Sequence, residues 1–177
     1  MTDYLVEAKS RRELRECAEL VRKTFHLEDT LYFPIVRLLD VLSEISENFS
    51  YEIVEDSELP ANVHADTDVM SGHIRIKESV YNGACDGKGR DRMTIAHEIC
   101  HFFTLCVFGF KLQRNFDGRE VTTYNDPEWQ AKCMAGELMI SKRLVAGMNV
   151  YEIVEACGVS EQAASYQKCK FREEDEK

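Results

Sequence analysis

The amino-acid sequence predicts an α+β fold, in which one mostly helical domain carries a small β-sheet beside a central helix. Three observations predict it. Long stretches with apolar residues at helical spacing dominate the chain, only short segments alternate as strands do, and no repeat or linker divides it. At 177 residues the chain is long enough to bury one core. We expect a single domain over residues 1–172 and an acidic, solvated tail over 173–177.

Composition argues against several classes of protein. A formal net charge of −10 opposes the coating of nucleic acid by bulk electrostatics. No apolar run approaches the roughly 18–20 residues of a membrane span, and the N-terminal residues lack the apolar stretch of a secretory signal. The seven cysteines form an odd set without a CxxC pair, which favours reduced thiols. We therefore expect a cytoplasmic protein that has no membrane partner.

The first part of the chain, residues 10–49, is predicted to be helical. Ser10 and Glu13 form a capping box at the start of the first helix. Pro34 suits the first turn of the second helix. Each helix carries an apolar stripe, formed by Leu14, Cys17, Ala18, Val21 and Phe25 in the first and by Ile35, Leu38, Leu39, Leu42 and Ile45 in the second.

The next part, residues 50–141, is predicted to hold the sheet and a metal core. Residues 51–55 and 72–77 are short, favour β-structure and partly alternate, so we interpret them as strands. A third strand is expected around Val63. The glycine-rich segment 84–91 is expected to be a loop that leads directly into the central helix.

The run "TIAHEICHFF" (residues 94–103) places two histidines four residues apart on a predicted helix. Side chains at this spacing differ by about 40° in direction, so His97 and His101 can reach one ion with the short bonds that zinc prefers. Glu98 lies on the flank of that face, where a carboxylate can act on water without being a ligand. A separate core face is formed by Ile95, Ile99, Phe102 and Cys106, and Cys100 is also expected to point into the core.

A catalytic zinc ion usually has three protein ligands, so a further ligand is needed downstream. The candidates are Glu120, Glu128, Glu137 and several aspartates. Asp126 and Pro127 mark a helix start, which places Glu128 in the first turn, on a face with two alanines that allow another helix to approach. Glu137 falls about 180° away from Glu128 and is expected to face solvent. Glu128 is the predicted third ligand, its alternative role being a carboxylate that the helix dipole favours.

The stretch "RMTIAHEICHFF" followed by "PEWQAKCMAGELMIS" resembles the ImmA/IrrE family of metallopeptidases. In that family an HExxH helix is followed by a helix that bears a glutamate, and the resemblance covers most of residues 30–170. Lys132, Met134 and Ser141 stand where the family often has asparagine, phenylalanine and proline. The resemblance implies a zincin-like fold with one zinc ion per chain. It also implies a protein substrate, often a helix-turn-helix repressor encoded beside the peptidase in a mobile element or stress-response operon.

The residues and the resemblance together predict a zinc-dependent endopeptidase that cuts such a repressor. The two histidines and Glu128 would hold the ion, and Glu98 would take a proton from water and pass it to the leaving amine. Tyr124 is a candidate for stabilising a developing oxyanion. The strand nearest the active helix, interpreted as residues 73–77, is expected to pair with an extended substrate.

Two other functions stay open at this point. The domain would be a non-proteolytic regulator if it kept the metal but bound a repressor or toxin partner without cutting it. It would be a structural protein if it bound no metal. The polar connection 111–126 is long enough to serve a function such as substrate recognition.

The remaining features favour no further site. Residues 149–171 are predicted to form two helices that look like a helix-turn-helix. Glu161 and the scarcity of lysines on the second of these helices argue against direct nucleic-acid binding. His64 and His73 lie near the predicted sheet, where we expect partly buried polar groups that do not bind metal.

Overall fold

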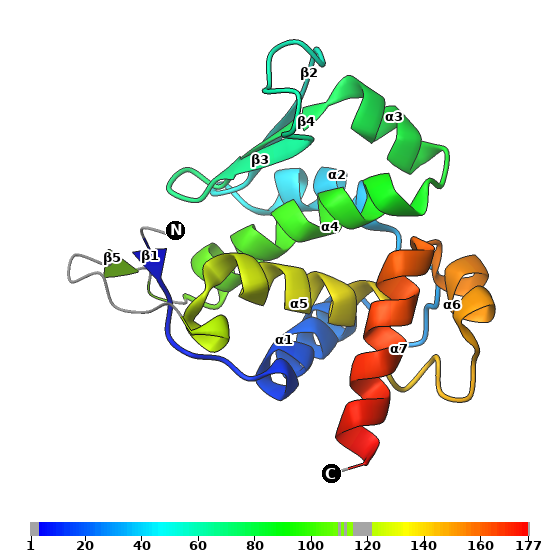
Figure 1. Ribbon diagram of the computed structural model, residues 1–177. Helices are drawn as coiled ribbons and strands as arrows, with labels where there is room; N and C mark the ends of the chain where they lie inside the picture. The colour runs from blue at the N-terminus through cyan, green and yellow to red at the C-terminus, as the bar shows by residue number, and fades with distance from the viewer. Residues whose placement is uncertain (1–3, 110, 112, 115–121, 177) are drawn as a thin grey trace.

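The computed structural model describes residues 4–109, 111, 113–114 and 122–176 and confirms the predicted α+β fold. Figure 1 shows a small sheet on one side of α4 (Gly89–Phe102), the helix that carries both histidines. On the other side α4 packs against α5 (Pro127–Met139), and α5 packs in turn against α1 (Arg11–Thr24). The central helix therefore lies between the sheet and a layer of helices.

Both predicted N-terminal helices are present. Ser10 and Glu13 form the predicted capping box at the start of α1, and α2 (Ile35–Ile45) begins directly after Pro34. The members of the two apolar stripes that are buried are Leu14, Ala18, Val21, Ile35, Leu38, Leu39 and Leu42.

The sheet has three strands in the order β2 (Ser50–Val54), β4 (His73–Lys77) and β3 (Ala65–Asp68). β2 pairs with β4 in parallel, whereas β3 pairs with β4 antiparallel. The third strand was predicted around Val63, but Val63 lies in a turn, in which its N–H donates to Pro60 O at 2.9 Å. The prediction of substrate pairing along residues 73–77 was also wrong, because β4 is central and both of its edges are occupied. The edge strand that contacts α4 is β3.

The segment that leads into α4 is more helical than its glycines suggested. Helix α3 (Glu78–Cys85) was not predicted, and it leaves a connection of only residues 86–88 before α4 begins at Gly89. At its other end α4 continues into the π-helical segment η1 (Phe103–Val107). A π-helix turns less per residue than an α-helix, so the facing of side chains changes there. Cys106 was predicted to face the core, but it is exposed. Cys100 is buried, as predicted.

The connection 111–126 is described only in part. Strand β5 (Gln113–Arg114) pairs antiparallel with β1 (Tyr4–Leu5), and the short 3₁₀-helix η2 (Thr123–Asn125) precedes α5. Residues 112 and 115–121 lie outside the described residues, and so does the candidate ligand Glu120.

Two C-terminal helices follow as predicted, namely α6 (Val150–Cys157) and α7 (Glu161–Asp175), which stand beside the α1–α5 layer (Figure 1). Gly158 joins them in a left-handed conformation at φ 61°, and a Cβ there would meet the Tyr32 ring at 2.2 Å. The predicted tail boundary at 173 was wrong, because α7 continues through Asp175. Glu174 and Asp175 both pair with Lys142, and these ion pairs hold the end of the helix on the domain.

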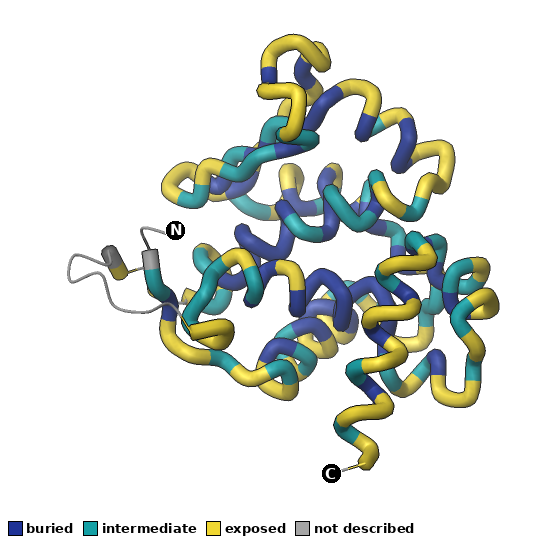
Figure 2. The backbone as a smooth tube through the Cα atoms, viewed as in Figure 1, coloured by how far each residue is buried: buried dark blue, intermediate teal, exposed yellow. Residues whose placement is uncertain are grey.

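One arginine ties α4 to the C-terminal helices. Arg92 is 2% exposed; its guanidinium donates to Gly158 O and Phe33 O at 2.8 Å and stacks over the Tyr32 ring. A buried charge with this many acceptors fixes the elements it joins. The buried residues concentrate where α4, α5 and α1 meet (Figure 2). Among the helices that the structure describes, none is both long and apolar enough to cross a membrane.

Candidate metal centre

The metal face of α4 has the geometry that its spacing predicts. Nε2 of His97 and Nε2 of His101 lie 3.1 Å apart, so the two rings point to one place. His101 is largely buried and His97 is partly exposed, which leaves the site open on one side. The opposite face of the helix packs into the core through Ile95, Ile99 and Phe102, which holds the two histidines in place.

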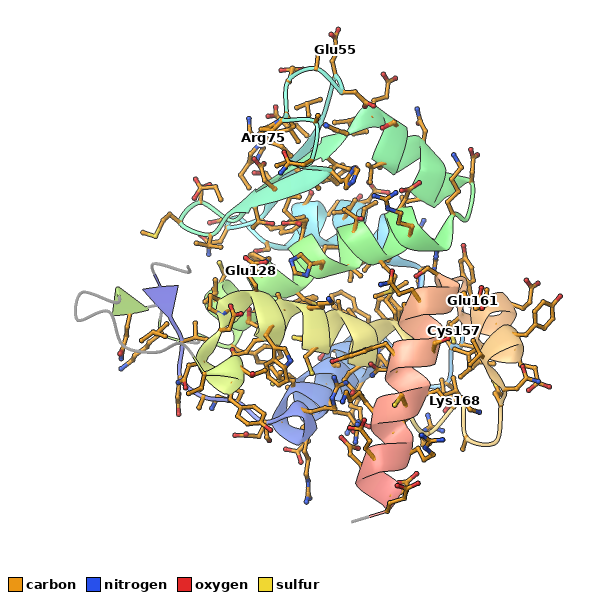
Figure 3. All side chains as sticks on the ribbon, viewed as in Figure 1. Glu55, Arg75, Glu128, Cys157, Glu161 and Lys168 are labelled. Carbon is orange, nitrogen blue, oxygen red and sulfur yellow. The ribbon has the colours of Figure 1, made fainter. Side chains whose placement is uncertain are left out.

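Glu128 completes the group from the neighbouring helix. Asp126 caps α5 and accepts from the Glu128 N–H at 3.0 Å, and Pro127 occupies the first turn, so the side chain of Glu128 leaves the helix at its very start. Figure 3 labels it at the end of α5 that lies against α4. One carboxylate oxygen lies 3.2 Å from Nε2 of His97 and the other 3.3 Å from Nε2 of His101.

These three side chains fit a zinc ion. Two ligands that each stand about 2.0–2.1 Å from a tetrahedral zinc ion are about 3.3–3.4 Å apart. The observed separations of 3.1–3.3 Å are close to that value, and the three residues form the one candidate metal group among the described residues. Two imidazoles and a carboxylate are also the donors of catalytic zinc sites that keep a position open for water.

The electrostatics of the group favour a cation. Hydrogen bonds with His101 and then His97 hold the pKa of the Glu128 carboxyl well below its usual value, so Glu128 is a carboxylate at neutral pH. Both imidazoles turn their Nε2 atoms toward that carboxylate and toward each other. Neutral imidazole nitrogens and a carboxylate are the forms in which these groups bind metal.

Glu98 stands beside this group and is not part of it. It is 8% exposed, and burial raises the pKa of its carboxyl, while the neighbouring His97 and a hydrogen bond from Thr67 act in the opposite direction. The Thr67 hydroxyl donates to Oε2 of Glu98 at 2.7 Å. Thr67 lies on β3, so the edge strand of the sheet orients the carboxylate.

Thr67 is the site residue that the sequence reasoning missed. The segment Ala65–Asp68 contains two aspartates, which are rare in strands, so the third strand was predicted around Val63, just before this segment, and Thr67 was not singled out. The one available signal was its position shortly before the strand at 73–77, at a distance that suits a hairpin partner.

The competing ligand Glu137 is buried, and the prediction that it faces solvent was wrong. It does lie on the opposite side of α5 from Glu128, but that side packs against α1. Arg11 donates to one of its oxygens at 2.8 Å and Arg15 to the other at 2.7 Å. The helical wheel gives the direction of a side chain and not what occupies that direction.

The other candidate residues are not members of the metal group. The ring of Tyr124 packs edge-on against Trp129, is 54% exposed, and its hydroxyl bonds to no other described residue. Nε2 of His64 lies 2.8 Å from the Arg90 guanidinium, and His73 contacts Ser50 and Glu52. Neither histidine belongs to the candidate metal group.

Comparison with known proteins gives the fold and little more. No protein-family model matches the chain, and no curated protein does. A solved structure described as a Mycobacterium tuberculosis transcriptional regulator is similar, with a TM-score of 0.57 and 14% identity. The alignment covers 86% of this chain and 45% of that chain, so this chain spans less than half the length of its neighbour. At this identity the likeness shows that the two share a fold.

Proposed function

We propose that the protein is a zinc-dependent endopeptidase of the ImmA/IrrE type. One observation carries the proposal: two imidazoles and a carboxylate converge with the separations of a zinc site, and a second, buried carboxylate, that of Glu98, stands beside them. A zinc ion held by these residues would supply Lewis acidity, which would polarise a peptide carbonyl and make water more acidic. We expect one zinc ion to bind per chain.

The residues of the chain supply the proton transfer. Glu98, held by the Thr67 hydroxyl, accepts a proton from the attacking water and delivers it to the nitrogen of the leaving amine. Burial raises the pKa of Glu98, which brings its carboxyl closer to the range in which one group can both accept and donate a proton. Tyr124, which lies just before α5, remains the candidate for binding the developing oxyanion.

The sheet offers a place for an extended substrate. β3 pairs with β4 on one side, and among the described residues its other edge has no strand partner. That edge strand lies against α4 and carries Thr67, so a peptide added to β3 would pass the proposed metal centre. This replaces the predicted pairing with residues 73–77.

The proposed substrate is a helix-turn-helix repressor encoded near the gene, as the family resemblance implies. We place the activity in the cytoplasm, because all seven cysteines are free thiols. The alternative is a regulator that binds a repressor or toxin partner and does not cut it. The similar solved structure is described as a transcriptional regulator, which keeps this alternative in view.

The test compares the wild type with Glu98→Gln, both loaded with zinc and incubated with the repressor encoded next to the gene. The peptidase proposal expects wild type to cut the repressor at one position and Glu98→Gln to retain zinc without cutting. The matched control is Glu78→Gln, an exposed glutamate of α3, which should cut like wild type. A wild type that binds both zinc and the repressor but leaves it intact would support the alternative.

A further inference from the structure

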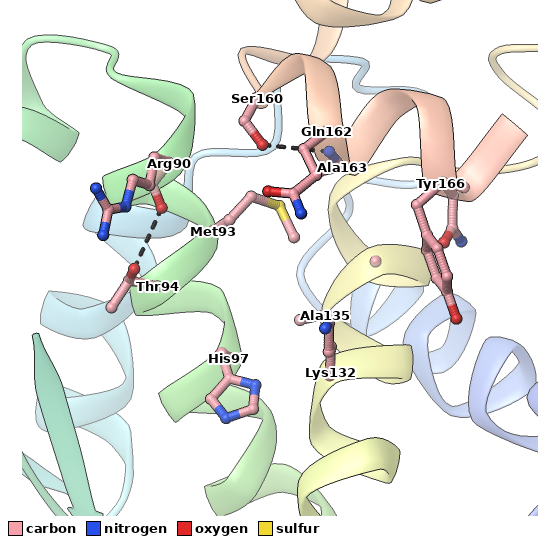
Figure 4. A pocket seen from close by; sticks show the side chains of 12 residues that line it. Arg90, Met93, Thr94, His97, Lys132, Ala135, Ser160, Gln162, Ala163 and Tyr166 are labelled. Atoms are coloured by element: carbon pink, nitrogen blue, oxygen red, sulfur yellow. Dashed lines mark hydrogen bonds between the residues drawn. The ribbon is translucent and has the colours of Figure 1, made fainter. Parts of the chain in front are cut away.

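A pocket of about 380 Å³ opens beside the proposed metal centre, between α4, α5 and α7. His97 forms part of its wall, so the pocket and the metal group share a residue (Figure 4). Met93 of α4, Ala135 of α5 and Ala163 of α7 provide apolar surface. A side chain attached to a peptide bond at the metal therefore has an apolar recess next to it.

The charges around this recess are all of one sign. No aspartate or glutamate lines it, although the whole chain has a net charge of −10. Lys132 and Arg90 do line it. Lys132 is exposed and forms no ion pair with any described residue, including Glu128 one helical turn before it. The guanidinium of Arg90 lies 2.8 Å from Nε2 of His64 and forms no ion pair with any described residue.

Gln167, which lines the pocket, carries a buried hydrogen-bond donor that has no acceptor among the described residues. Gln167 is 1% exposed; its Oε1 accepts from Arg11, but its Nε2 has no partner among the described residues. An unpaired buried donor is unfavourable, and an acceptor brought by a ligand would relieve it. The N-terminus of α7, at Ser160, adds the positive end of a helix dipole to the same pocket.

We propose that this pocket is the subsite that receives a substrate side chain next to the scissile bond, and that it selects glutamate. The aliphatic part of a glutamate suits the apolar wall, while its carboxylate offers acceptors to Lys132 and to the donor of Gln167. A lysine in the same place would meet Lys132 and Arg90, and a leucine would leave both cations and the donor unpaired. The inference rests on the proposed use of the adjoining metal site.

Binding of zinc-anchored probes tests the subsite without cleavage. The protein is zinc-loaded Glu98→Gln, and the probes are peptide hydroxamates in two series, with the variable residue on the acyl side or on the amine side of the hydroxamate. Each series contains glutamate, glutamine, leucine and lysine. In one series we expect glutamate to bind about fivefold tighter than leucine, with lysine weakest, because a partly exposed ion pair contributes modestly. Raising the salt concentration should reduce the difference.

Variants at one position then decide which group is responsible. Lys132→Met should remove most of the preference for glutamate, and Lys132→Glu should reverse it in favour of lysine. Zinc content is measured in each, because Lys132 lies one turn from Glu128. Lys23→Glu changes the same charge on an exposed residue of α1 that does not line the pocket, and it should leave the order unchanged.

Two outcomes overturn the inference: equal affinity for glutamate and leucine in both series, or a preference that survives in Lys132→Glu. If the glutamate preference is found but wild type cuts no peptide that carries glutamate on the favoured side, the subsite stands and the peptidase proposal fails. If wild type cuts peptides without regard to glutamate, the peptidase stands and the subsite fails.

Discussion

Two glutamates of α5 differ in almost every respect except their chemistry. Glu128 stands in the first turn with 59% of its side chain exposed, and its partners are two imidazoles of α4. Glu137, on the opposite side of the same helix, is fully buried between two guanidinium groups of α1. One carboxylate therefore faces two imidazoles, which can bind a metal ion, and the other faces permanent cations.

The difference separates a site from a structural ion pair. Arg11 and Arg15 balance the charge of Glu137 and satisfy both of its oxygens, so nothing further is needed there. At Glu128 two imidazole nitrogens and a carboxylate converge on one place, and a metal ion is the species that would bind all three groups. Donor atoms that converge in this way are typical of a metal site, whereas a carboxylate closed by two guanidinium groups serves the fold.

The largest expected effect is the loss of stability when Glu137 is removed. Glu137→Ala leaves two guanidinium groups partly buried without their carboxylate, and breaking a buried pair in this way costs about 3–5 kcal/mol. Chemical denaturation of the metal-free protein measures this loss of stability. The control is Glu155→Ala, at an exposed residue of α6. Glu152 is unsuitable as a control because its side chain caps α6. A loss below about 1 kcal/mol would mean that the pair contributes no more than a surface contact does.

The second prediction concerns zinc binding at Glu128 and the two histidines. Zinc at about 100 times its dissociation constant should stabilise the wild type by about 2.7 kcal/mol, because the ion binds the folded state. The stabilisation should disappear in Glu128→Ala, His97→Ala and His101→Ala and persist in Glu98→Gln, whose carboxylate is not a ligand. Thermal unfolding with zinc and with a chelator gives the shift. Equal zinc content in wild type and both histidine variants would refute the centre.

The third prediction sharpens the contrast between the two glutamates. In the absence of metal, Glu128→Ala should change the free energy of unfolding by less than about 1 kcal/mol, because its carboxylate is largely exposed and solvent screens its interactions with the two imidazoles. Denaturation in a chelator is the measurement. A loss as large as that of Glu137→Ala would show that Glu128 serves the fold as well as the site.

The sequence predicted the convergence of His97, His101 and Glu128 better than it predicted what surrounds these residues. The spacing of His97 and His101, and the helix start at Asp126, depend on local geometry, which residue order determines directly. What lies opposite a residue depends on how elements pack, and therefore Glu137 was placed in solvent although it meets Arg11 and Arg15.

The fold shows the same division. The capped helices and the two strands with β-favouring residues were predicted, because their signals are local. Strand β3 was displaced and α3 was missed, since an aspartate-containing strand is stabilised by its pairing with β4 and not by its own propensity. The end of α7 was taken for a solvated tail because its charges find partners only in the tertiary structure.

The smallest expected effect on stability concerns Glu174, which shares Arg15 with Glu137 at the edge of the ion-pair network formed by these residues and Arg11. Burial by itself would raise the pKa of Glu174, but Arg15 and Lys142 outweigh it and hold the pKa below its ordinary value. A carboxyl with a depressed folded pKa stabilises the fold above its unfolded pKa of about 4.3, and the contribution is lost as the pH falls through the folded pKa.

Glu174→Gln should therefore destabilise the protein by about 0.5 kcal/mol at pH 7, as expected for a partly exposed pair. The difference from wild type should shrink as the pH falls below about 4. Glu155→Gln removes an equal charge from an exposed residue of α6 that pairs with no described residue, so it controls for net charge. Denaturant midpoints measured between pH 7 and pH 3 give both differences. A Glu174 difference that stays constant over this range would mean that the side chain acts through packing and not through its charge, and the network would then end at Glu137.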